Sequence, residues 1–171
     1  MKNWLSKRLL ATAIILPALG GVAWAQDNDG CSNATLQGDY AFAVTGWNLS
    51  PGQLWVPAVI IGVTQFDGQG KFTQVDYPGD GLLSSPPVTD FRTGQTGTYA
   101  VRGDCTGSAE LDLNVGGIGA GHGVIQLMFV VSNGGRSIHG VVAGGTSPFA
   151  TKPSVSQART DWWKVGSERD D

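Results

Sequence analysis

The sequence is poor in the residue types that carry most enzymatic chemistry. Its 171 residues include two histidines and two cysteines, and only 15% of them are charged. It contains no Gly-x-Ser-x-Gly nucleophile elbow, no His-Glu-x-x-His zinc motif, no EF-hand loop and no P-loop. The glycine-rich run 117–121 has the wrong spacing for a dinucleotide-binding loop, and no predicted helix follows it. These absences exclude the enzyme classes that such motifs define.

Positive charge is also scarce. The first 25 residues hold three of the eleven basic residues and none of the fourteen acidic ones. The remainder therefore has eight basic and fourteen acidic side chains, a net charge of −6. A mildly acidic chain with scattered charges lacks the basic surface that binds nucleic acids or anionic lipids. We expect neither partner.

The only long apolar run lies at the N-terminus. Lys2, Lys7 and Arg8 precede the apolar residues 9–19, and Ala23-Trp24-Ala25 supplies the small-x-small pattern that signal peptidase recognises. A membrane-spanning helix needs roughly twenty apolar residues, and this run is shorter. The pattern therefore predicts a cleavable signal peptide.

The predicted boundaries follow from that cleavage site. Residues 1–25 form the signal peptide, and residues 26–171 form a single domain with a flexible leader at 26–30 and a charged tail at 167–171. No later run is long enough to span a membrane. We expect an exported protein, in the periplasm or outside the cell, and the signal resembles those of Gram-negative bacteria.

Both cysteines, Cys31 and Cys105, lie in the exported part. In an oxidising compartment two cysteines most simply form one disulfide, here joining the start of the domain to its middle. The alternative is a pair of free thiols with a catalytic role. Neither cysteine lies in a Cys-x-x-Cys motif or beside an evident basic residue, which favours the disulfide.

Short runs of β-branched and aromatic residues, separated by Gly, Asn and Asp, replace helical periodicity along the chain. Asp67-Gly68 is a strong hairpin signal between two of these runs. A meander of hairpins removes its exposed edges most simply by closing, so we predict an all-β antiparallel barrel of about eight strands, with a two-layer β-sandwich as the alternative. The predicted strands are 39–47, 55–66, 71–77, 98–102, 106–115, 122–131 and 136–142.

The closing strand is the least clear element. Residues 154–165 read either as an eighth strand, which we favour, or as a short helix with Pro153 in its first turn. Residues 78–97 contain two consecutive prolines and four glycines and are predicted to form a long loop, as are residues 114–121. Loops of this length often cover the opening of a small barrel.

Two pairs of polar residues are candidate sites. His122 and His139 fall on neighbouring predicted strands, close to opposite one another, but two histidines without a carboxylate fit solvent-facing strand residues better than a metal site. Glu110 and Asp112 share one strand face opposite Ala109 and Leu111, the alternation of a strand with its acids in solvent. We therefore predict no metal and no cofactor.

Aromatic residues are more numerous than a barrel core of this size requires, and the strand 55–66 is apolar on both faces. A strand of that kind is buried on both sides or lies at an interface. Barrels of about eight strands are either filled by side chains or hold one small ligand. The candidate ligand-binding residues are Tyr40, Trp47, Trp55, Tyr99, Arg102 and His122.

Three segments resemble a group of secreted, uncharacterised bacterial proteins: 31–40 with its Leu-x-Gly-x-Tyr strand, 66–72, and 97–107 with its Asp-Cys-Thr-Gly turn. That group is similar in strand pattern to the allene-oxide-cyclase-like and calycin barrels. The resemblance implies an eight-stranded antiparallel barrel with a Cys31–Cys105 bridge, and a function in cyclising or binding apolar molecules. No residue here matches a cyclase's catalytic set, so none is transferred.

Three functions are consistent with this sequence. The first is an exported barrel that binds a small apolar ligand in or at its opening. The second is an envelope or assembly interaction module, and a homo-oligomer is compatible with it. The third is a cyclase-type enzyme that shapes an apolar substrate inside the barrel, where positioning supplies much of the rate.

Overall fold

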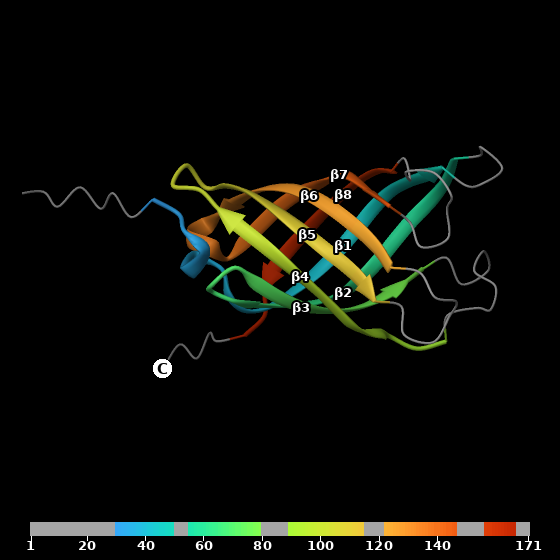
Figure 1. Ribbon diagram of the computed structural model, residues 1–171, viewed down its shortest axis with the longest axis horizontal. Helices are drawn as coiled ribbons and strands as arrows, with labels where there is room; N and C mark the ends of the chain where they lie inside the picture. The colour runs from blue at the N-terminus through green and yellow to red at the C-terminus, as the bar shows by residue number, and fades with distance from the viewer. Residues whose placement is uncertain (1–29, 50–54, 80–88, 115–121, 147–155, 167–171) are drawn as a thin grey trace, which may run out of the picture.

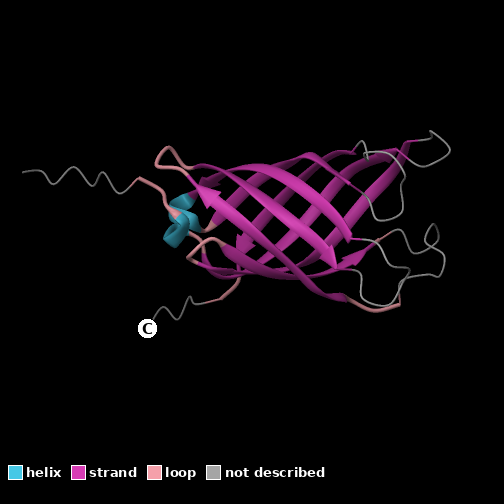
Figure 2. Ribbon diagram, viewed as in Figure 1, coloured by secondary structure: helices cyan, strands magenta, loops and turns pink. Residues whose placement is uncertain are grey.

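The computed structural model describes residues 30–49, 55–79, 89–114, 122–146 and 156–166, and these form one closed antiparallel β-barrel (Figures 1 and 2). The predicted signal peptide, most of the leader and the charged tail lie outside the described residues. The eight strands are β1 (Gln37–Leu49), β2 (Trp55–Asp67), β3 (Lys71–Pro78), β4 (Arg92–Val101), β5 (Thr106–Asn114), β6 (His122–Ser132), β7 (Ser137–Thr146) and β8 (Ser156–Lys164).

Every strand pairs with its neighbours along the chain, and β8 pairs with β1 to close the sheet. The closing ladder runs from Tyr40 opposite Lys164 to Asn48 opposite Ser156. The predicted barrel is confirmed, and the β-sandwich alternative is wrong. Residues 156–164 form a strand, so the helical alternative for this segment is also wrong.

The barrel has two unlike ends, which we call the closed end and the mouth. The closed end carries the tight connections between β2 and β3, β4 and β5, and β6 and β7, together with the 3-10 turn η1 (Asn33–Thr35) (Figure 1). The mouth is the opposite end, where β1, β3, β5 and β7 end. The connections at the mouth, including residues 115–121 of the second predicted loop, fall largely outside the described residues.

Side-chain alternation assigns one face of each strand to the interior. Tyr40 and Phe42 of β1 point inward, and on β2 Ala58, Thr64 and Phe66 are buried. Phe42 lies over Gly62, where a Cβ would approach its ring to 2.7 Å, so only glycine leaves room for that ring. Inward-facing side chains of both β1 and β2 therefore fill this part of the barrel interior.

The closed end is packed with aromatic rings. Phe66 contacts Tyr40 and Tyr99 edge-on, with ring centroids 5.3 and 5.0 Å away, and lies 5.6 Å from Phe72. Edge-to-face pairs of this kind add to the free energy of burial. The Tyr99 hydroxyl donates to the carbonyl of Leu36, and that of Tyr40 donates to the carbonyl of Gly135. Both phenols are thus structural members of the core.

The N-terminal segment seals this end. A disulfide joins Cys31 to Cys105 in the β4–β5 turn, as predicted. Asn33 Oδ1 accepts the backbone N–H of Val101 at 2.8 Å, and Leu36 is completely buried beneath the turn. The disulfide and these contacts hold η1 across the bottom of the barrel.

Two expectations about strands and loops need correction. The predicted loop 78–97 is too long, because β4 begins at Arg92 rather than Thr98. The first half of β4 lacks the alternating apolar residues that predict a strand, because Arg92 and Gln95 are both polar. Gln95 is nevertheless buried. His122 and His139 are not opposite one another: His139 pairs with Val130, and His122 pairs with Asn114 of β5.

Among the described residues, no helix is long and apolar enough to cross a membrane.

Replacing both Cys31 and Cys105 with Ala removes a cross-link between residues 74 positions apart. We expect the free energy of unfolding to fall by about 4 kcal/mol, because the unfolded chain regains the entropy of that loop. Urea unfolding followed by tryptophan fluorescence measures the change. A fall of less than about 1 kcal/mol, relative to the oxidised wild type, would contradict the role given to the bridge.

Burial, with Tyr99 as a second cause, raises the pKa of Tyr40 to about 12. The unfolded phenol ionises near its model value of 10.0, so the free energy of unfolding should be unaffected by this group below pH 10 and fall between pH 10 and 12. Absorbance at 295 nm during alkaline titration follows the phenolate. The transition near pH 12 should disappear in Tyr40→Phe, whereas a Tyr40 that ionises near pH 10 would refute this account.

Candidate functional site

Several inward-facing aliphatic side chains toward the mouth are less buried than the core of the closed end, although Ala58 and Ala158 are buried there. At the closed end Leu36, Tyr40 and Ile138 are almost completely buried. Toward the mouth, aliphatic side chains that also point inward are only partly buried and pack against the edge of the core. They come from five different strands and are Val44, Ile60, Leu113, Ile125 and Val142. The described part of the mouth thus presents apolar interior surface that side chains do not fully cover.

The remaining wall of the mouth, formed by β3 and β4, is polar. Asp76 lies on the interior face of β3, two residues from the strand's end, with 3% of its side chain exposed. Arg92, the first residue of β4, pairs with it through two parallel bonds of 2.7 Å, from Nε to Oδ1 and from Nη2 to Oδ2. The guanidinium side chain keeps 21% exposure. This bidentate ion pair lies at the boundary between the core and the mouth.

A chain of hydrogen bonds runs from this ion pair into the core. Gln95 Nε2 donates to Asp76 Oδ1 at 2.7 Å, and Gln74 Nε2 donates to Gln95 Oε1 at 3.0 Å. Thr64 Oγ1 donates to Gln74 Oε1 at 3.0 Å, and the indole Nε1 of Trp162 donates to Thr64 Oγ1 at 3.2 Å. We call these residues, with Arg92, the polar ladder.

The direction of the ladder follows from its two ends. An indole N–H can only donate, and a carboxylate can only accept. Each amide and hydroxyl between Trp162 and Asp76 must therefore donate toward Asp76, with no alternative arrangement of the protons. Hydrogen bonds aligned in this way strengthen one another. The ladder consequently holds the carboxylate of Asp76, and through it Arg92, in one position.

Such a ladder is an expensive way to stabilise a core. Removing two charges from water costs several kcal/mol per ion, and well-packed apolar residues of similar volume are often as stable or more so. In the described strands, Asp76 and Arg92 are the only charged residues on the interior face toward the mouth; Lys164, opposite Tyr40, shares that face at the closed end but is exposed. Buried charged groups placed beside an opening are typical of binding sites. The mouth is therefore the candidate functional site.

Thr160 is a second unusual feature of the interior. It lies on β8, pairs with Gly140 and Val44, and is 1% exposed. Its hydroxyl has no hydrogen-bond partner among the described residues. Thr64, equally buried, both donates and accepts. The two threonines offer a matched test of what a hydrogen bond is worth in this barrel.

The structure distributes the six sequence-predicted ligand residues and does not gather them. Tyr40 and Tyr99 lie in the packed closed end. Trp47 and Trp55 point outward, with 51% and 45% exposure. Arg102 is exposed in the β4–β5 turn, where its Nη1 donates to Thr106 Oγ1. His122 begins β6 at the mouth, and its side chain lies outside the described residues.

Sequence reasoning missed the polar ladder, although one signal was present. Residues 71–77 were predicted as a strand, and its apolar residue Phe72 is followed on the same face by Gln74 and Asp76. Such alternation places polar groups inside the sheet once Phe72 is assigned to the core. The partner residues Arg92 and Gln95 were hidden because their strand was predicted to be a loop.

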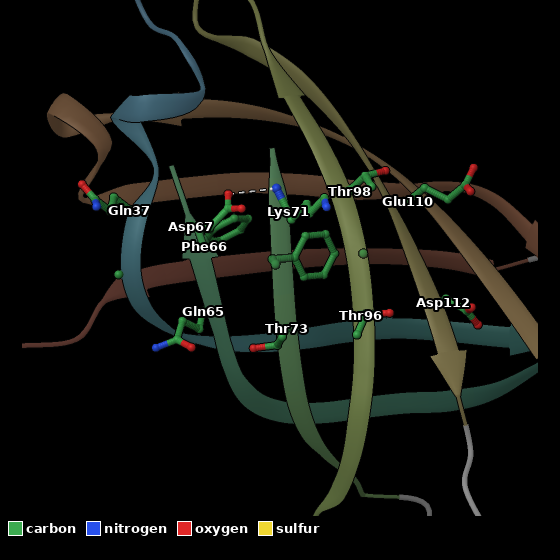
Figure 3. A pocket seen from close by; sticks show the side chains of 13 residues that line it. Gln37, Gln65, Phe66, Asp67, Lys71, Thr73, Thr96, Thr98, Glu110 and Asp112 are labelled. Carbon is green, nitrogen blue, oxygen red and sulfur yellow. Dashed lines mark hydrogen bonds between the residues drawn. The ribbon is translucent and has the colours of Figure 1, made fainter. Parts of the chain in front are cut away.

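A groove of about 720 Å³ lies on the outer wall over β2 to β5, away from the interior (Figure 3). Its side chains are outward-facing and polar, among them Gln65, Thr73, Thr96 and Glu110. Glu110 and Asp112 point outward and Leu111 inward, as predicted. Backbone N–H groups of Lys71, Gln69 and Gly70 lower the pKa of Asp67 at its edge, which the β2–β3 turn explains.

His139 forms a separate outer-wall cluster. Its Nδ1 lies 2.8 Å from Asp161 Oδ1, and Asp161 also lies 3.4 Å from Arg159 Nε. The imidazole is 53% exposed, so the pair is a solvent-facing contact between β7 and β8. Within the described ranges, no three His, Cys, Asp or Glu side chains are placed to hold a metal ion.

No protein-family model matches this chain, and no curated protein matches it. The interpretation of the mouth therefore depends on its own geometry.

Replacing Thr64 with Val should lower the free energy of unfolding by about 1–3 kcal/mol, because Trp162 Nε1 and Gln74 Oε1 lose their partners inside the core. Thr160→Val, with the same change in shape, should be neutral or stabilise by about 1 kcal/mol, because it removes a hydroxyl that is buried without a partner. Thermal and urea unfolding compare the two variants. Equal destabilisation would contradict the hydrogen-bond pattern described above.

Proposed function

We propose that this barrel binds a small, mainly apolar ligand at its mouth. The observation that carries the proposal is the ring of partly exposed aliphatic side chains on β1, β2, β5, β6 and β7, facing the Asp76–Arg92 pair on β3 and β4. Ligand pockets typically combine a mostly apolar lining with a few fixed polar groups. The described mouth offers that combination.

The packed half of the barrel limits how far a ligand can enter. Trp162 lies against Phe42, with ring centroids 6.2 Å apart, and its indole N–H is held by Thr64. Below this level the aromatic rings of the closed end fill the interior. A ligand therefore occupies the upper part of the barrel, with the polar ladder as its floor on one side.

We further propose that the chain works outside the cytoplasm. The Cys31–Cys105 disulfide supports this, because structural disulfides persist in oxidising compartments and are rare in the cytosol. The apolar ligand and the export route are independent parts of the proposal, and either can be tested alone.

A second candidate is an interaction module, favoured by the outer face of β2. Val59 and Ile61 are both 50% exposed there, and Ile61 lies between Ala43 and Tyr77 on the adjoining strands. Contiguous exposed apolar surface can mark a site of protein–protein interaction. Analytical ultracentrifugation of wild type and Ile61→Lys distinguishes this role, since ligand binding at the mouth leaves the sedimentation coefficient unchanged.

The test of ligand binding uses two neighbouring valines of β7. Val142 points into the mouth and Val141 points to solvent. We expect Val142→Trp to fill the opening and weaken binding of the uncharged fluorophore N-phenyl-1-naphthylamine by about tenfold or more, whereas Val141→Trp leaves it unchanged. Fluorescence titration measures both, and the thermal midpoint confirms folding.

Native mass spectrometry of the protein purified without organic solvent provides an independent readout. A bound mass that organic extraction removes supports the proposal. Absence of fluorophore binding to the wild type, or equal loss in both tryptophan variants, would overturn it.

A further inference from the structure

The ion pair at the mouth bears on the kind of polar group that a ligand can carry, and this inference rests on the proposed function. Arg92 has five N–H donors, of which two are used on Asp76. No other partner of its guanidinium occurs among the described residues, and the side chain is one-fifth exposed. The mouth therefore offers hydrogen-bond donors from Arg92 to a ligand.

The acceptor side of the pair is already occupied. Asp76 Oδ1 accepts from Arg92 Nε and Gln95 Nε2, and Oδ2 accepts from Arg92 Nη2. With its side chain 3% exposed, Asp76 has little capacity left for a ligand donor. The polar group that fits this site is consequently an acceptor.

The charge of the ligand's acceptor group decides whether a carboxylate or an uncharged oxygen fits this site. The positive charge of Arg92 is neutralised by Asp76 at 2.7 Å, and no other charged residue of the described strands lies on the interior face toward the mouth, since Lys164 shares that face only at the closed end. A ligand carboxylate would bring a second negative charge close to Asp76 and leave the site with an uncompensated charge. In a partly desolvated site such repulsion is weakly screened. An uncharged oxygen receives the hydrogen bonds without that cost.

We infer that the barrel selects uncharged apolar ligands that carry a carbonyl or hydroxyl oxygen, and that the Asp76–Arg92 pair discriminates against the corresponding carboxylic acids. Arg92 donates to the ligand oxygen. Asp76 is the specificity residue, because it cancels the charge of Arg92 while leaving its remaining N–H groups available. The polar ladder keeps Asp76 in place as the ligand exchanges.

Four ten-carbon probes test the inference by displacement of N-phenyl-1-naphthylamine at pH 8: 2-decanone, 1-decanol, decanoate and decane. For the wild type we expect the ketone and the alcohol to bind about tenfold more tightly than decanoate and more tightly than decane. Asp76→Asn keeps the shape of the side chain and removes its charge, so Arg92 becomes an uncompensated cation. This variant should prefer decanoate, a reversal of selectivity.

The matched control is Asp161→Asn, which makes the same substitution on the outer wall at a carboxylate beside His139 and Arg159. It should keep the wild-type order of affinities. Circular dichroism and the thermal midpoint establish that each variant is folded. Should Asp76→Asn not fold, Arg92→Met provides the second test: it should abolish the preference for ketone and alcohol over decane.

The outcomes separate this inference from the proposed function. Decanoate binding to the wild type as tightly as 2-decanone, or decane as tightly as 1-decanol, would overturn the selectivity while leaving a binding barrel. No displacement by any probe from a wild type that binds the fluorophore would also overturn it. Failure of the fluorophore itself to bind would overturn the proposed function and this inference together.

Discussion

The pairing of β8 with β1 is the constraint on which the rest of the structure depends. It converts a meander with two exposed edges into a closed wall, so each strand has one face that must be accommodated inside. In a barrel of eight strands the interior is just wide enough to be filled by side chains or to hold one small ligand. In this chain the closed end is packed with aromatic rings, whereas several aliphatic side chains of the mouth are only partly buried.

Much of this architecture could be predicted from the sequence, because local signals and the global fold agree. The alternation around Tyr40 and Phe42, the Asp67-Gly68 turn and the two cysteines each specify a feature that the structure contains. The resemblance to secreted bacterial barrel proteins stays a prediction. The prediction of a closed barrel came from the need of a strand meander to remove its exposed edges.

The candidate site was much harder to predict, and for a physical reason. Hydrophobic periodicity finds a strand when its inward residues are apolar, but β4 begins with Arg92 and places Gln95 inside. Those residues are tolerated there only because β3 supplies Asp76 and Gln74 as partners, a tertiary fact that no local window contains. The register of β6 against β7 was likewise non-local: a bulge between Gln126 and Leu127 helps to set it. The missed start of β4 therefore coincides with the polar interior, whereas the missed histidine register lies on the outer wall.

The closed end has a consequence for how the molecule can be presented to its surroundings. β1 begins there and β8 ends there, beside the bridge between Cys31 and Cys105 (Figure 1). Both ends of the described barrel, at residues 30 and 166, therefore lie on the side opposite the mouth. If either terminus were attached to a surface or to a second domain, the mouth would point away from the attachment point.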